Sequence, residues 1–66
     1  MRPQMLEAFK KYCEGNIAKT KMDIEVYLNN PVGIGEHPDI MDALKTKMTE
    51  LSEYDELLST VNKYFP

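Results

Sequence analysis

Residues 29–39, NNPVGIGEHPD, interrupt a helical pattern that otherwise runs along this 66-residue chain. The stretch holds two of the three glycines, two of the four prolines and the only histidine. Proline lacks the backbone N–H that a helix needs, and glycine gives the chain the conformational freedom that a reversal requires. The sequence therefore predicts a loop over residues 30–37 between two helices of nearly equal length.

The predicted first helix covers residues 3–29. Pro3 suits the first helical position, where a missing N–H costs nothing, and the Asn29-Asn30-Pro31 sequence ends the pattern. Side chains at helical spacing form a main stripe of Leu6, Phe9, Cys13, Ile17, Thr20, Ile24 and Leu28. A second strip lies roughly opposite and consists of Ala8, Tyr12, Gly15, Met22 and Val26. One partner helix cannot cover both strips, so we expect a further contact on this helix.

The predicted second helix covers residues 38–65. Pro38 occupies its first position, His37 is its expected cap, and Asp39 and Asp42 oppose the positive end of the helix dipole. Its inner face combines a heptad repeat with the residues between: Leu44, Leu51, Leu58 and Phe65, then Met41, Met48, Tyr54 and Val61. A short connection returns the second helix along the first. The expected fold is a single all-α domain over residues 1–66, a two-helix antiparallel hairpin.

The small size of the chain points to assembly. A domain this short buries only about 60% of its unfolded surface and is marginal alone. The single cysteine, Cys13, cannot form an internal disulfide, and one cysteine with one histidine cannot supply four side-chain zinc ligands. We therefore expect a homo-oligomer, a dimer or higher, built as a helical bundle. Its predicted interface residues are Tyr12, Met22, Val26, Leu57 and Tyr64.

Charge and hydropathy limit the partners of this chain. The net charge is -3, and residues 1–30 carry five basic and four acidic side chains against three and seven in residues 31–66. Nucleic-acid binding relies on clustered Lys and Arg, so we expect no nucleic-acid partner. The sequence has no run of roughly 18 apolar residues and no signal-peptide pattern, so we expect a cytoplasmic protein without a membrane partner.

The central loop holds the candidate ligand-binding residues, Gly33, Gly35 and His37. Backbone N–H groups of a Gly-x-Gly segment before a helix can receive an anion. No strand precedes this segment, neither GKS nor GKT follows it, and acidic residues flank it, all of which count against phosphate. The structural alternative is a rigid reversal in which the glycines adopt positive φ.

His37 has no evident catalytic companion. Cys13 is expected near the middle of the first helix, between apolar neighbours, as a buried and inert thiol. The sequence thus predicts no catalytic residue, no metal site and no cofactor. Several loops gathered around an oligomer axis could still bind a divalent metal through His37 and carboxylates, and this alternative stays open.

The segment Asn30-Pro31-Val32-Gly33-Ile34-Gly35-Glu36-His37, followed by an acidic helix that ends in Lys63-Tyr64-Phe65, resembles a family of small uncharacterised helical proteins of tailed phages, including marine myoviruses. The resemblance covers the whole hairpin and brings no known activity or site residues. It implies a phage setting, with the host cytoplasm as the location. Phage products of this size are more often accessory, inhibitory or assembly proteins than enzymes.

Together these patterns predict a non-enzymatic helical hairpin that forms homo-oligomers and acts through protein–protein interaction, as a phage accessory or host-modulating protein. The alternative is an oligomeric protein that binds a nucleotide or another anion with residues 33–37.

Overall fold

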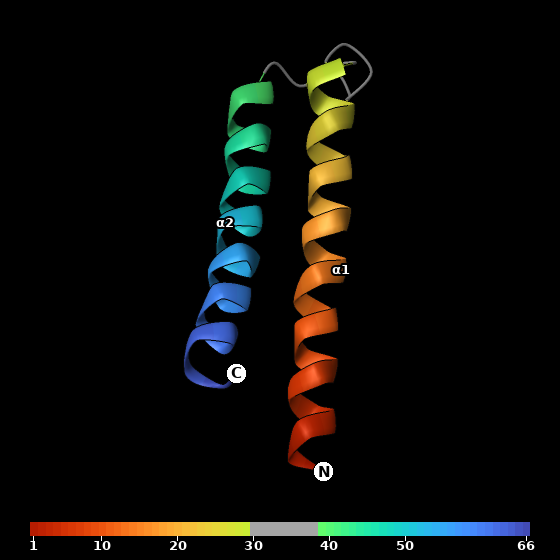
Figure 1. Ribbon diagram of the computed structural model, residues 1–66. Helices are drawn as coiled ribbons and strands as arrows, with labels where there is room; N and C mark the ends of the chain where they lie inside the picture. The colour runs from red at the N-terminus through yellow and green to blue at the C-terminus, as the bar shows by residue number, and fades with distance from the viewer. Residues whose placement is uncertain (30–38) are drawn as a thin grey trace.

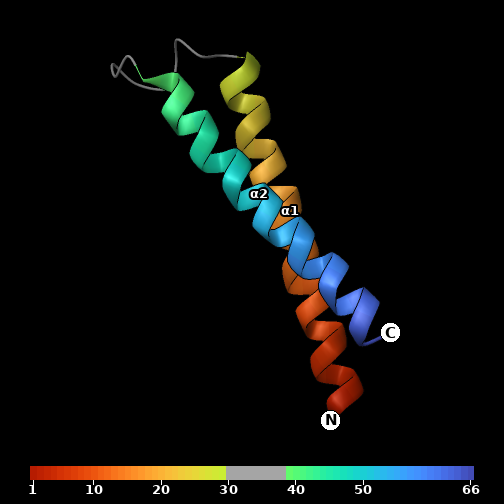
Figure 2. The same cartoon turned by 90° about the vertical axis from the view of Figure 1, so that its left-hand side faces the viewer.

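The computed structural model describes residues 1–29 and 39–66, so the predicted loop lies outside the described residues. It contains two helices, α1 (Arg2–Asn29) and α2 (Ile40–Tyr64), which pack against each other. They run antiparallel, and both termini lie at the same end of the molecule (Figure 1). The view turned by 90° shows α2 following α1 at a shallow crossing (Figure 2). The predicted all-α, two-helix antiparallel hairpin is confirmed.

Three of the four helix ends match the prediction within one residue. α1 begins one residue earlier than expected, at Arg2, and ends at Asn29 as expected. The Asn29 Nδ2 donates to the Glu25 carbonyl oxygen at 2.7 Å, which occupies a carbonyl of the last turn. α2 ends at Tyr64, and Phe65 is its C-cap residue.

The start of α2 differs from the prediction. The expected start at Pro38 with His37 as cap is two residues too early, because α2 begins at Ile40 and Asp39 is its N-cap. The Asp39 Oδ1 accepts the backbone N–H of Asp42 at 3.1 Å. Aspartate is a preferred N-cap residue since its carboxylate accepts a free N–H and its negative charge opposes the helix dipole, whereas histidine carries no negative charge.

The core between the helices is thin. Its buried side chains are Cys13, Thr20 and Ile24 of α1 and Val61 of α2. Half-buried side chains extend this contact along both helices: Leu6, Ile17, Leu44, Leu51, Tyr54 and Leu58. The middle of each predicted inner face therefore does form the helix contact.

Residues at the edges and ends of the predicted inner faces are exposed. They are Phe9 and Leu28 of the main stripe on α1, and Met41, Met48 and Phe65 of the predicted inner face of the second helix. Two helices touch along a line, so side chains on the flanks of each apolar face stay partly in solvent. The periodicity identified the right side of each helix and overestimated the width of the contact.

The hairpin is a rod. Its principal extents are 47 × 15 × 14 Å and its radius of gyration is 15.0 Å, against about 11 Å for a compact domain of this length. Neither α1 nor α2, the two helices of the described chain, has an apolar stretch that could cross a bilayer.

Candidate functional site

An ion-pair network links the two helices. The Asp23 Oδ2 lies 3.2 Å from the Lys19 Nζ on the same helix and 3.3 Å from the Lys47 Nζ on α2. Lys47 also lies 3.6 Å from the Glu50 Oε2. Hydrogen bonds from Lys19 and Lys47 hold the pKa of Asp23 below its usual value, and the hydrogen bond to Asp23 raises the pKa of Lys47. This network joins α1 and α2 at the level of Asp23 and Lys47.

An aromatic cluster makes a second link between the helices. The rings of Phe9 and Tyr12 stack with centroids 6.1 Å apart at 25°. The Tyr12 ring meets Tyr54 of α2 edge-on, with centroids 6.0 Å apart at 72°. Hydrogen bonding to Tyr12 raises the pKa of the Tyr54 hydroxyl. Edge-to-face pairs of this kind are favourable by about 0.5–1.5 kcal/mol beyond their buried area.

The network and the cluster lie on one long side of the hairpin. Tyr12 and Asp23 are eleven residues apart, which is about three turns of helix and returns to the same side of α1. We call this side, where Tyr12 reaches Tyr54 and Asp23 reaches Lys47, the bridged face. Its half nearer the chain termini is aromatic and its other half is charged.

The predicted interface residues are exposed on or beside the bridged face. The exposed fractions are 56% for Tyr12, 64% for Met22, 51% for Val26, 42% for Leu57 and 63% for Tyr64. Val26 and Leu57 each follow a bridging residue by three positions, so they lie one turn along the same side. Their exposure makes them available to a partner; that they form an interface stays a prediction.

Sequence reasoning missed two members of this surface and the cross-helix link. Phe9 was assigned to the core but lies partly in solvent beside Tyr12, and the three-residue spacing of the two rings was the available signal. Met5, which is exposed, precedes Tyr12 by seven residues and lies on the same side. The bond between Asp23 and Lys47 had no sequence signal, because it depends on the register of the two helices.

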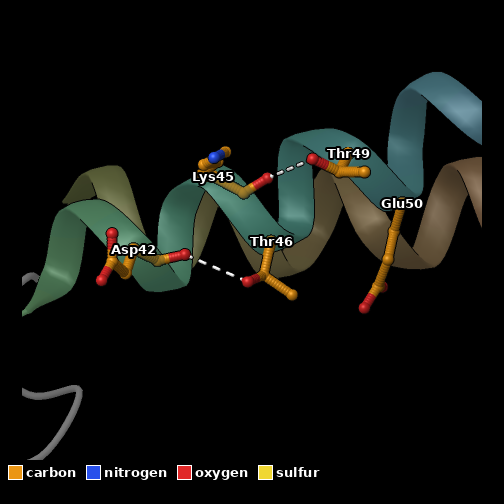
Figure 3. A pocket seen from close by; sticks show the side chains of 5 residues that line it. All are labelled: Asp42, Lys45, Thr46, Thr49 and Glu50. Atoms are coloured by element: carbon orange, nitrogen blue, oxygen red, sulfur yellow. Dashed lines mark hydrogen bonds between the residues drawn. The ribbon is translucent and has the colours of Figure 1, made fainter.

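A polar hollow lies along α2 (Figure 3). It is lined by Asp42, Lys45, Thr46, Thr49 and Glu50. The Thr46 Oγ1 donates to the Asp42 carbonyl oxygen at 3.1 Å, and the Thr49 Oγ1 donates to the Lys45 carbonyl oxygen at 2.8 Å. Both hydroxyl protons are thus engaged by the helix itself, and all five residues come from one helix. The hollow offers no nucleophile held by a base.

The other candidates for chemistry are buried or lie outside the described residues. Cys13 is fully buried, as predicted for an inert thiol. The candidate ligand-binding residues Gly33, Gly35 and His37 are not among residues 1–29 and 39–66, so the loop site stays a prediction. Within those two ranges no three His, Cys, Asp or Glu side chains gather closely enough to hold a metal ion.

No family model, curated protein or solved structure matches this chain. The similarity of residues 30–37 to phage proteins stays a prediction.

The pKa shifts predict how stability depends on pH. Asp23 has a lowered folded-state pKa, so its contribution is complete above its ordinary pKa of 3.8 and is lost as the pH falls through the lowered value. Lys47 and Tyr54 have raised folded-state pKa values. Their contributions to the free energy of unfolding are therefore complete below their ordinary pKa values of 10.5 and 10.0, and are lost as the pH rises through the raised values. We expect the free energy of unfolding to fall at both extremes.

The acid side can be assigned by comparing the parent with Asp23→Asn in urea unfolding at several pH values. Between about pH 5 and pH 2 the variant should lose less stability than the parent, because it lacks the titrating carboxylate. If the free energy of unfolding fell equally with decreasing pH in both proteins, the Asp23 network would add nothing to stability.

Proposed function

We propose that this chain is a non-enzymatic helical hairpin that assembles with copies of itself and acts through protein–protein interaction. One observation carries the proposal. The chain exposes 5254 Å² at a mass of 7.6 kDa, whereas a compact folded monomer of that mass exposes about 4,300 Å². The hairpin thus leaves more surface uncovered than a compact domain of the same mass, in keeping with its 47 × 15 × 14 Å shape.

The composition of that exposed surface supports the same proposal. Within residues 1–29 and 39–66, twelve large apolar side chains are exposed and four side chains are buried. A chain of this size needs a stabiliser beyond such a core, and pairing of two hairpins into a four-helix bundle would supply it.

The groups that could carry chemistry give little support to an enzyme. Cys13 is buried, and the hydroxyls of Thr46 and Thr49 donate to backbone carbonyls. In the phage setting implied by the loop sequence, the role we propose is that of an accessory or host-modulating protein in the host cytoplasm.

Sedimentation velocity and thermal unfolding test the assembly directly. We expect a dimer or higher species at micromolar concentration and an unfolding temperature that rises with protein concentration, as mass action requires. A well-folded monomer whose unfolding temperature is independent of concentration would overturn the proposal.

A further inference from the structure

We propose that two copies pair through their bridged faces about a two-fold axis parallel to the helices, so that α1 of each copy packs against α2 of the other. This proposal rests on the self-association proposed above and adds the surface and the orientation. Such an interface is isologous, because each contact occurs twice.

The bridged face has the shape and apolar character that helix packing needs. Exposed apolar side chains follow it from end to end: Met5, Phe9, Tyr12, Val26, Leu57 and Tyr64. Two surface hollows lie at its edges, one beside Leu57 and Thr60 and one beside Met22 and Val26. A Cβ placed on Gly15 would meet nothing within 4 Å, so a neighbouring helix can approach the α1 backbone there.

The opposite side of the hairpin suits a partner less well. Its groove has an apolar floor of Ile17, Met48 and Leu51. Lys21 and Asp55 stand at its rim. Among the described residues one exposed large apolar side chain, Met48, lines this groove, whereas six follow the bridged face.

Charge decides the orientation of the pair. The α1 side of the bridged face is flanked by Lys11 and Lys19, which pair with Glu7 and Asp23 of the same helix. The α2 side is flanked by Glu53 and Glu56. An axis perpendicular to the helices would also place α2 on α2 and bring the two glutamate-bearing strips together. An axis parallel to the helices instead places each glutamate-bearing strip against the charge-balanced strip that carries Lys11 and Lys19, which is the more favourable arrangement.

The heights along the rod agree with this orientation. Within one hairpin Tyr12 is level with Tyr54, and Asp23 is level with Lys47. A two-fold axis parallel to the helices preserves these levels. Lys11 therefore comes level with Glu53 and Glu56 of the partner subunit.

A charge exchange between two chains tests this pairing. One chain carries Lys11→Glu, and the other carries Glu53→Lys with Glu56→Lys. Each variant alone places like charges together twice in its dimer, which should weaken self-association about tenfold. In the mixed dimer, Lys11 of the second chain meets the native Glu53 and Glu56 of the first. At the other contact the introduced glutamate at position 11 meets the two introduced lysines, so opposite charges face each other there as well.

The readout is native mass spectrometry after the two variants are unfolded in urea, mixed and refolded. Random pairing gives half mixed dimers, and tenfold weaker self-pairing raises that fraction to about nine-tenths. As the control, Lys21→Glu makes the same charge change on the opposite side, and its mixture with the parent chain should pair randomly.

A fraction of mixed dimers above one half supports the pairing of α1 with α2. This holds whether or not either variant forms stable dimers alone. Random pairing of the two exchanged variants overturns this orientation and leaves the proposed self-association standing. Monomers alone, in the parent chain as well, overturn both proposals.

Discussion

Replacement of Ile24 by asparagine is expected to unfold the hairpin, with a loss of about 4 kcal/mol in the free energy of unfolding. Ile24 is only 5% exposed at the contact between the helices. The substitution removes a buried branched side chain and leaves an amide there without a partner, and these two costs add. A chain of this length has a total stability of only about 3–10 kcal/mol. Urea unfolding followed by far-UV circular dichroism measures the loss.

Leu28→Asn is the matched control, because Leu28 belongs to the same predicted stripe one turn further along. Leu28 is 56% exposed, so this change should cost less than about 1 kcal/mol. Equal losses at the two positions would contradict the line of contact described here.

Tyr54→Ala is expected to cost about 2–3 kcal/mol, the second-largest effect. Tyr54 is half-buried and its ring carries the edge contact with Tyr12, so truncation removes both buried area and the aromatic pair. The measurement is again urea unfolding, at one fixed protein concentration because self-association raises apparent stability.

Two further variants separate the ring from the hydroxyl. Tyr54→Phe keeps the ring and its edge contact with Tyr12, so it should cost less than about 1 kcal/mol. A double-mutant cycle with Tyr12→Ala should give a coupling energy of about 0.5–1.5 kcal/mol. A coupling of zero would show that the edge contact does not stabilise the hairpin.

The architecture was predictable because two independent signals agreed. Pro31 and the loop glycines break the helical pattern, and the stripe through Cys13, Thr20 and Ile24 shows which side of the first helix meets the second. Periodicity gives every position of a stripe equal weight, however, whereas contact depends on distance from the line where two helices touch. Leu28 has the right spacing and lies in solvent for this reason.

The cap of α2 shows a different limit. Pro38 and Asp39 both carry a helix-start signal, since proline favours the first helical position and aspartate favours the position before it. In this chain proline comes before aspartate, so Pro38 as the first helical residue and Asp39 as the N-cap predict different helix starts. The side-chain bond from Asp39 to the Asp42 N–H decides between them, and it appears only when three-dimensional geometry is known.

The candidate surface was predictable only in part. The second strip on the first helix pointed to Tyr12, Met22 and Val26, and each is exposed. The bridged face depends on which α2 residues lie level with them, and this register is visible in cross-helix contacts such as the ion pair of Asp23 with Lys47. Spacing within one helix carries no information about such a register.

The position of both termini at one end of the rod has a mechanical consequence (Figure 1). A force applied between the two ends pulls the helices apart sideways, so the contacts between them carry load one after another. The contact at Val61 opens first, followed by the aromatic cluster, and the bond between Asp23 and Lys47 opens later. Such a hairpin peels at low force, although the same contacts together hold it closed at equilibrium.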